Sequence, residues 1–478
     1  MSRQIINLTK QTLTYGVGNI LTRFITFLLL PLFTNLLTPE EYGLATLVFV
    51  FLGFMNIIYH YGIDSAFLRS FADTEDEDNK RRLFSTAIWL SLGTGFMFST
   101  LIYTFSYSLS SLLLKDPQYV NIFRMAAGIL LFDAAAHVPF ALLRMNEKAK
   151  TFIIIKLINV ITTLGLNIYL ITIVKTGISG IFLSAFIASV ITMIIVSLVT
   201  ISSLRFNFSL ILVKKYLKFG LPFVPAGLAS IMMETIDRYI LAHLKDTATV
   251  GLYSAGYKLG VFMLLITTAF NYAWQPFFLR IGNTKEAKPI FARVFTYYIL
   301  GTSFVWITLT AFMHEIIRFQ FFGFSFIGPS FYNSEIIISV VLLAYIFQGV
   351  YLNFIPGIYF EKKTHYIPLL ILPGALVNIC LNFVLIPRFG IMGAAIATLV
   401  GYIVMAFITF PVTQKLFKVP YEWGQISKIV LSSLVAIYTI INFGNSLPYK
   451  FLSVFIFLIL ILFMNFPLVK AKVKYFFK

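Results

Sequence analysis

Residues 83–114 read LFSTAIWLSLGTGFMFSTLIYTFSYSLSSLLL, which is 32 consecutive positions without a charged side chain. A helix of about 20 apolar residues crosses the roughly 30 Å hydrocarbon core of a bilayer, so this segment is long enough to span a membrane. Similar charge-free runs recur along the chain, at 176–204, 336–360 and 389–414 among others. The sequence therefore predicts an all-α integral membrane protein.

The composition supports this class. Apolar residues make up 59% of the 478 positions, charged residues make up 12%, and the mean hydropathy is +0.88. Soluble domains carry about 25% charged residues, roughly twice as many. The net charge of +18 does not indicate a nucleic-acid partner, because the basic residues form small clusters between apolar runs. The single Cys380 excludes a disulfide framework and a cysteine-based zinc site.

The apolar runs predict about fourteen membrane-spanning helices. The N-terminus carries Arg3 and Lys10 before a long apolar stretch without a small-residue cleavage site, so it reads as a retained first helix. Pro39 disfavours helix at the preceding residue and marks the first break, at 38–41. The predicted spans are 13–37, 42–63, 84–110, 120–143, 151–174, 177–204, 219–243, 249–275, 291–313, 335–360, 366–387, 391–414, 425–443 and 451–469.

The basic residues predict the orientation. With the N-terminus in the cytoplasm, the inside segments hold 26 Lys and Arg residues and the outside segments hold six. Cytoplasmic loops of membrane proteins carry such an excess, and one missed helix would invert the assignment downstream. Both termini are therefore expected in the cytoplasm.

Two pairs of segments indicate an internal repeat. The stretch from Tyr15-Gly16 to Tyr42-Gly43-Leu44 resembles Phe219-Gly220 to Val250-Gly251-Leu252. Lys150-Thr151 followed by Gly177-Ile-Ser-Gly180 corresponds to Lys363-Thr364 followed by Gly390-Ile-Met-Gly393, both at an offset of 213. Parallel repeats of six helices place a binding site between them. The predicted organisation is an N-terminal six-helix lobe (1–204), a cytoplasmic linker (205–218), a C-terminal six-helix lobe (219–418) and two additional helices with a basic tail (419–478).

Several charged residues fall inside predicted spans, where each costs about 3 kcal/mol at a helix centre. Arg23 lies mid-helix with Asn19 one turn before it. A cation lining a cavity is the preferred interpretation of Arg23, and a tie to a carboxylate on another helix is the alternative. Arg124 and Lys258 are further candidates for substrate binding, and Lys156 either joins them or extends to the nearby cytoplasmic interface.

The seventh predicted helix carries Glu234, Asp237 and Arg238. Glu234 and Arg238 are four residues apart and can pair along the helix, which leaves Lys258 as a candidate partner for Asp237. Asp133, Glu234 and Asp237 are thus either ion-coupling residues or members of structural ion pairs. Arg238 is also a substrate-binding candidate, because the excess of intramembrane cations over carboxylates suits an anionic cargo such as a phosphate.

Other kinds of site have little support. His60 and His137 read as core histidines, and no motif predicts a metal or cofactor. The longest outside loop, near His314 to Ser334, has no nucleophile or acid/base pair with diagnostic spacing. A membrane-embedded polymerase or ligase is therefore disfavoured, and the protein is not expected to be an enzyme.

Three segments resemble the bacterial polysaccharide flippases, the repeat-unit exporters of O-antigen, capsule and teichuronic-type polymers in the multidrug/oligosaccharidyl-lipid/polysaccharide exporter superfamily. They are Leu36-Leu37-Thr38-Pro39-Glu40-Glu41-Tyr42-Gly43-Leu44, Asp237-Arg238-Tyr239-Ile240-Leu241, and Val250-Gly251-Leu252-Tyr253-Ser254-Ala255-Gly256-Tyr257-Lys258-Leu259. The resemblance covers essentially the whole chain through short, degenerate motifs.

This resemblance implies a V-shaped, MATE-like fold of two lobes in the bacterial cytoplasmic membrane. It implies alternating access that moves an undecaprenyl-pyrophosphate-linked oligosaccharide to the outer leaflet, with membrane lipids and other polysaccharide-assembly proteins as partners. Arg23 resembles the first-helix cavity arginine of lipid II flippases, although its surroundings match poorly, and the last two helices would form a groove for the lipid tail. A lipid II flippase and a multidrug antiporter of the same superfamily remain the alternatives; the antiporters usually have twelve helices and carboxylate-rich cavities.

Overall fold

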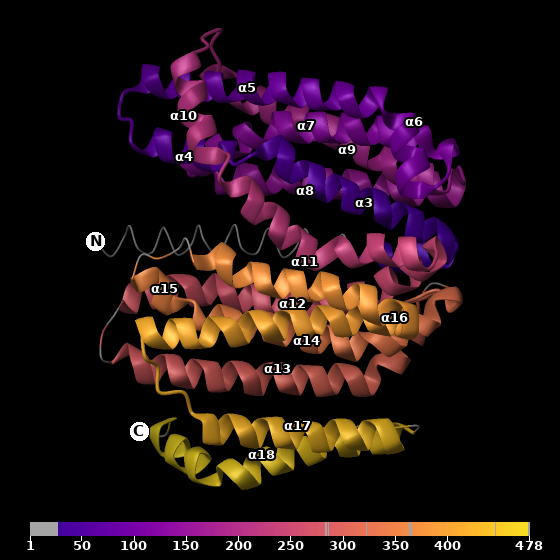
Figure 1. Ribbon diagram of the computed structural model, residues 1–478, viewed down its shortest axis with the longest axis vertical. Coiled ribbons are helices and arrows are strands. Elements are labelled where there is room, and N and C mark those ends of the chain that lie inside the picture. Colours follow the sequence, from indigo (N-terminus) through magenta and orange to yellow (C-terminus); the bar gives the residue numbers. More distant parts are fainter. Residues whose placement is uncertain are drawn as a thin grey trace. The chain divides into compact units, whose positions relative to one another are not determined.

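The computed structural model describes residues 27–476 apart from 283, 285, 322, 362, 364, 365 and 445, without side-chain detail for 321 and 463–476. The chain forms two compact units that meet in sequence between Ser254 and Ala255, inside one long helix. Figure 1 shows the helices of each unit. The lobe boundaries expected near residues 204 and 219 stay a prediction.

The N-terminal unit is helical throughout its described part. Helices α5, α7 and α9 pack side by side, and α3, α4 and α8 pack against α7 (Figure 1). The elements are α2 (Leu29–Leu36), α3 (Pro39–His60), α4 (Ile63–Ala72), α5 (Glu77–Thr104), α6 (Ser106–Leu109), η1 (Ser110–Leu114), η2 (Pro117–Tyr119), α7 (Val120–Met145), α8 (Ala149–Ile168), η3 (Tyr169–Ile173), α9 (Ile178–Thr200), η4 (Ile201–Ser203), α10 (Leu210–Gly220), α11 (Phe223–Leu244) and the start of α12 (Thr247–Ile281).

The C-terminal unit contains the rest of α12 and packs α14 against α13 and α16, with α17 alongside α13 and α18. A two-stranded antiparallel hairpin caps α13, pairing Gln320 with Ser325 and Phe321 with Phe324. The elements are α13 (Ala287–Arg318), β1 (Gln320–Phe321), β2 (Phe324–Ser325), η5 (Pro329–Ser334), α14 (Glu335–Phe354), α15 (Pro356–Phe360), α16 (Tyr366–Leu416), α17 (Trp423–Phe443) and α18 (Leu447–Phe476).

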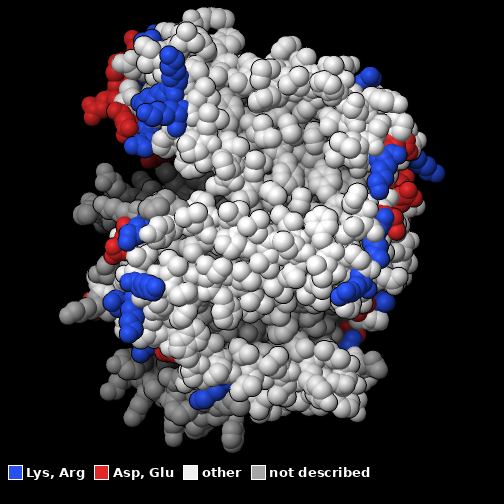
Figure 2. All heavy atoms as spheres, viewed as in Figure 1, with Lys and Arg blue, Asp and Glu red and all other residues white. Residues whose placement is uncertain are grey.

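The helices confirm an all-α membrane fold. Ten described helices are long and apolar enough to cross a bilayer, or eleven if the bent pair α10 and α11 is one span. Helix α16 holds two predicted spans, because Gly390 interrupts it, and Leu447–Leu462 is a shorter apolar helix. The first predicted span, 13–37, lies mostly outside the described residues. In each unit, nearly all charged side chains on the face shown in Figure 2 lie towards the helix ends.

The predicted break at 38–41 is a capped helix start. The Thr38 hydroxyl accepts from the Glu41 backbone N–H at 3.2 Å, and the Glu41 carboxylate accepts from the Thr38 N–H at 2.9 Å. This reciprocal capping box satisfies two backbone donors that a helix start leaves unpaired, and Pro39 at the first position needs no partner. The start of α3 is therefore fixed by local sequence.

The two pairs of repeat glycines occupy matching positions in the structure. Gly177 has φ 59° and ψ −139°, and Gly390 has φ 54° and ψ −130°, a conformation that favours glycine. Gly43 and Gly251 lie in the first turns of α3 and α12, where these helices cross. A Cβ on Gly43 would collide with the Thr247 carbonyl, and one on Gly251 would collide with the Pro39 carbonyl. The repeat read from the sequence thus has a counterpart in backbone geometry.

The predicted linker, 205–218, is mostly helical. It contains α10, which packs against α4 and α5. Tyr216 of α10 is fully buried, and its hydroxyl donates to the Leu83 carbonyl at 3.0 Å. The segment is therefore an integral part of the N-terminal unit.

Candidate functional site

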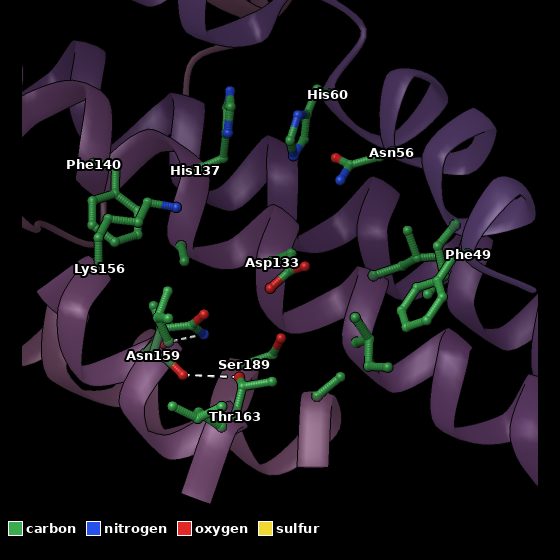
Figure 3. A pocket seen from close by; sticks show the side chains of 18 of the residues that line it. Phe49, Asn56, His60, Asp133, His137, Phe140, Lys156, Asn159, Thr163 and Ser189 are labelled. Carbon is green, nitrogen blue, oxygen red and sulfur yellow. Dashed lines mark hydrogen bonds between the residues drawn. The ribbon is translucent and has the colours of Figure 1, made fainter. Parts of the chain in front are cut away.

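A polar cavity of about 400 Å³ lies inside the N-terminal unit, enclosed mainly by α3, α7, α8 and α9. These helices have long apolar sequences, yet their facing positions carry polar side chains (Figure 3). The polar residues that line the cavity are Asn56 and His60 of α3, Asp133 and His137 of α7, Lys156, Asn159 and Thr163 of α8, and Ser189 and Thr192 of α9. This set is called the polar cavity below.

Helical spacing explains how these residues meet. Asn56 and His60, and likewise Asp133 and His137, are four residues apart and so project from one face of a helix. On α8, Lys156, Asn159 and Thr163 follow the same pattern at three and seven residues. Helices α7 and α8 each pack against α9, and α3 packs against α7. The polar faces therefore converge inside the unit.

Two histidines form one wall of the polar cavity. The rings of His60 and His137 stack with centroids 3.6 Å apart and an interplanar angle of 25°. His137 Nε2 lies 3.5 Å from an Asp64 carboxylate oxygen, which is also 3.7 Å from the Arg144 guanidinium. The buried Nε2 of His60 has no hydrogen-bond partner among the described residues. Because an unpaired buried nitrogen is costly, a bound water or ligand would stabilise this wall.

A cation and a carboxylate share the cavity. The Lys156 ammonium lies 4.5 Å from the centroid of the Phe140 ring, and Asp133 faces the Ser189 hydroxyl (Figure 3). Lys156 thus lines the cavity, one of the two alternatives that its sequence position allowed. Each charge alone would be costly inside a membrane, and their common polar surroundings reduce that cost.

The cavity floor is held by amide and hydroxyl groups. The Asn159 side-chain amide donates to the Thr192 hydroxyl at 2.8 Å, and the Thr163 hydroxyl donates to the Asn159 carbonyl at 2.8 Å. Thr192 in turn donates to the Ala188 carbonyl at 2.7 Å. The bond to Thr192 holds the Asn159 side-chain amide, whereas the bond from Thr163 goes to the Asn159 backbone carbonyl within α8.

A second cavity of about 540 Å³ adjoins the first. It lies between α3, α4 and α11, and shares Asn56 and His60 with the polar cavity. Asp64 and Ser65 add further polar groups to its lining, whereas Phe223 of α11 is apolar. His60 therefore lines two neighbouring spaces within the N-terminal unit.

The C-terminal unit has a cavity of different character. It measures about 590 Å³ and is lined almost entirely by apolar side chains from α13, α14, α16 and α17. Phe295, Trp306, Phe354, Phe410 and Trp423 contribute aromatic walls. This apolar cavity offers no charged group and suits a hydrocarbon ligand.

The site residues predicted from the sequence do not all lie in the polar cavity. Asn19 and Arg23 lie outside the described residues. Arg124 is exposed near the start of α7, where it bonds Asn121 Oδ1 at 3.3 Å and lies 5.2 Å over the Tyr103 ring. Of the charged residues singled out from the sequence and described in the structure, Asp133 and Lys156 line the polar cavity.

The predicted charges on α11 form a tight group. Arg238 Nη1 lies 2.7 Å from Asp237 Oδ1 and also donates to the Glu234 backbone carbonyl. The Tyr253 hydroxyl donates to the other Asp237 oxygen, and its ring lies 5.2 Å from the Arg238 guanidinium. Asp237 and Arg238 are buried, and Glu234 is half-buried. Arg238 and Asp237 therefore form a buried ion pair. Lys258 is half-buried on α12 in the C-terminal unit.

His60 and His137, which the sequence predicts as core histidines, line the polar cavity together with Lys156. Their signal was present, because each has a polar neighbour three or four residues away within an otherwise apolar helix. A polar face on a spanning helix marks a position turned towards protein or water. An isolated charge is easy to recognise in an apolar run, whereas a short polar face is recognised only from the spacing of its residues.

Comparisons with known proteins support the fold. A family model described as polysaccharide biosynthesis protein matches residues 32–323. The solved structure of lipid II flippase MurJ in an inward closed conformation is similar, with a TM-score of 0.76, 16% identity, and coverage of 96% of this chain and 99% of that one. No match is found among curated proteins.

Multidrug transporters are similar at lower scores. An inward-facing MATE family transporter of the MOP superfamily has a TM-score of 0.60 and 12% identity, covering 83% of this chain and 97% of that one. A mutant of the Vibrio cholerae MATE transporter VcmN has a TM-score of 0.60 and 16% identity, covering 87% and 97%. At these identities the structures show a shared fold, while the family model matches more than half of the sequence. The chain therefore belongs to the polysaccharide biosynthesis protein family, on the all-α membrane fold that MurJ and the MATE transporters share.

Proposed function

We propose that this protein is a flippase that moves a lipid-linked oligosaccharide from the cytoplasmic to the outer leaflet of the bacterial cytoplasmic membrane. The expected cargo is an undecaprenyl-pyrophosphate-linked repeat unit, carried by alternating access. The observation that carries the proposal is the polar cavity among membrane-spanning helices. Charged and polar side chains that face a cavity among spanning helices are costly to maintain in a bilayer and are expected where a hydrophilic cargo crosses.

The apolar cavity of the C-terminal unit supports the lipid part of this cargo. Helix α17, one of the two additional helices, contributes Trp423, Ile426 and Val430 to its wall. The resemblance to polysaccharide flippases predicted a groove for the lipid tail at these helices. A polyprenyl chain would exchange contacts with lipid tails for contacts with these side chains, so its binding there would depend on packing and not on transfer out of water.

The proposal includes the orientation of the protein in the membrane. The excess of Lys and Arg in alternate loops supports cytoplasmic N- and C-termini, so the cargo would be loaded on the basic side of the protein. An anionic pyrophosphate is attracted to that side before it enters. Arg23 and Asn19 stay candidate substrate-binding residues, together with Arg124, Arg238 and Lys258, and other polysaccharide-assembly proteins stay candidate partners.

The test is transport by purified protein in liposomes. The substrate is the lipid-linked glycan that accumulates in a strain lacking the gene, and its arrival in the opposite leaflet is measured by access to an impermeant periodate oxidant. Ethidium efflux from the same liposomes is measured in parallel. Flipping without ethidium efflux is expected, and ethidium efflux without flipping would assign the protein to the multidrug antiporters.

A lipid II flippase is the second candidate, because the fold similarity to MurJ covers 96% of this chain. Lipid II added to the same liposomes distinguishes the two. We expect the accumulated glycan-lipid to be flipped at least tenfold faster than lipid II, and the reverse ratio would favour the second candidate.

A further inference from the structure

We infer that the polar cavity of the N-terminal unit is a saccharide-recognition site, which holds one sugar ring of the transported oligosaccharide. This inference rests on the proposed function. It adds to that function which part of the cargo the N-terminal unit recognises. The cavity volume of about 400 Å³ lies within the range of roughly 300–1,000 Å³ that small-molecule sites occupy.

The hydrogen-bonding groups of the cavity match a polyol. A sugar hydroxyl both donates and accepts, so a sugar site needs both kinds of partner at close spacing. Asp133 supplies acceptor oxygens, Lys156 supplies donors, and the amides of Asn56 and Asn159 can supply both. The hydrogen bond from Asn159 to Thr192 holds one of these amides in place before a ligand arrives. Such preorganisation reduces the entropy cost of binding.

The histidine wall carries a ring nitrogen that lacks a hydrogen-bond partner among the described residues. His60 lines the cavity, and its buried Nε2 atom has no such partner. This atom exposes almost no surface, so a ligand hydroxyl reaches it only if the ring turns towards the cavity. The stack with His137 holds the plane of the His60 ring before a ligand arrives.

Apolar faces complete the site. Phe49 of α3 and Phe140 of α7 both line the cavity, and Figure 3 shows their rings on different sides of it. A pyranose ring has C–H faces as well as hydroxyls, and aromatic rings bury such apolar surface effectively. Because these aromatic groups flank the polar ones, the cavity suits a ligand that is polar at its edge and apolar on its faces.

The charge balance argues against the other components of the cargo and against drugs. A pyrophosphate would be attracted by Lys156 but repelled by Asp133, and an organic cation would be attracted by Asp133 but repelled by Lys156, so the opposite charges select for neither ion. A neutral polyol meets neither penalty. The adjoining cavity, which shares Asn56 and His60, has room for a further sugar.

Two substitutions test this site without introducing charge. Asn159→Leu removes an amide at similar volume, and His60→Phe keeps a stacking ring but removes both nitrogens. The matched control is Asn442→Leu, on the exposed face of α17, where the amide donates to the Tyr438 carbonyl of its own helix. All variants are compared with wild type for a monodisperse elution profile and for the transport described above.

The deciding measurement is calorimetric binding of the free oligosaccharide, released from the accumulated glycan-lipid by mild acid, to protein in nanodiscs. We expect about tenfold weaker binding for Asn159→Leu and for His60→Phe, and unchanged binding for the control. Inorganic pyrophosphate is the second probe and should bind all four proteins equally. Equal oligosaccharide binding by all four, or selective loss of pyrophosphate binding, would overturn the saccharide site.

A labelling experiment tests the site independently, in case Asn159→Leu or His60→Phe does not fold. Thr163→Cys is placed in a Cys380→Ser background, and the rate of maleimide labelling is measured with and without the oligosaccharide. At least fivefold slower labelling is expected, and an unchanged rate would contradict the site. If wild type moves the glycan-lipid but shows no protection, the saccharide site is wrong and the proposed function stands; if wild type does not move it, the proposed function itself fails.

Discussion

At the scale of single residues, the presence of Lys156 and Asp133 in one cavity is expected to affect the stability of the protein in a way that can be measured. Replacing one leaves the other as an isolated charge in a membrane-embedded cavity, whereas replacing both removes the two charges together. We expect Lys156→Met and Asp133→Asn each to destabilise the protein, and the double variant to be less destabilised than the sum, by about 1–3 kcal/mol. Thermal unfolding in detergent measures all three. Strict additivity would show that the two groups do not interact.

Arg238 gives a second prediction at this scale. Its guanidinium lies 2.7 Å from the Asp237 carboxylate, and both are buried. Removing one member of a buried ion pair typically costs about 3–5 kcal/mol, so Arg238→Ala is expected to unfold at a clearly lower temperature. Arg124→Ala serves as the control, because that arginine is exposed and should cost less than 1 kcal/mol. Similar melting temperatures for the two variants would argue against a structural role for Arg238.

At the scale of helices, the crossing of α3 and α12 depends on glycine. A methyl group at Gly43 or Gly251 would collide with the backbone carbonyl of the other helix, which cannot move aside cheaply. We expect Gly43→Ala to lower both stability and transport. Gly93→Ala on α5 is the matched control, because nothing lies within 4 Å of its added methyl, and alanine favours a helix by about 0.5–1 kcal/mol over glycine. A Gly43→Ala protein as stable and active as wild type would refute the close crossing.

At the break inside α16, glycine is needed for a different reason. Gly390 has open space around its α-carbon, so the cost of a side chain there comes from its φ of 54°. Gly390→Ala is expected to destabilise by about 1–3 kcal/mol. Gly301→Ala, on α13 and also in open space, should be neutral or stabilising. Urea or thermal unfolding compares them, and equal stabilities would contradict a backbone requirement at residue 390.

Most of these elements could be predicted from sequence, because spanning helices are set by apolar length and their breaks by local residues such as Pro39 and Gly390. The candidate site could not. Its residues come from four helices whose mutual rotation depends on packing, and no single helix shows more than two or three of them. Asp133 was found because a charge in an apolar run stands out, whereas His60 and Asn159 are neutral and stand out only by their spacing.

At the scale of the whole molecule, the distribution of basic residues predicts a topology that can be measured. The loop between α7 and α8 contains Lys148 and is expected inside, and the loop between α11 and α12 contains Lys245 and is expected outside. Alkaline phosphatase fused after Lys245 should be active, and the same enzyme fused after Lys148 should be inactive. A fluorescent protein that folds only in the cytoplasm should give the opposite pattern. Activity at both positions would invalidate the span count between them.

The matching backbone conformations of Gly177 and Gly390 have a consequence for the origin of the chain. Together with the repeated sequence motifs, they are what an ancestral gene that was copied and joined to itself would leave. Since each predicted copy contributes six crossings, the second copy would enter the bilayer with the same polarity as the first. An ancestor of half the length could therefore have worked as a pair of identical chains, and its fusion required no reversal of insertion signals.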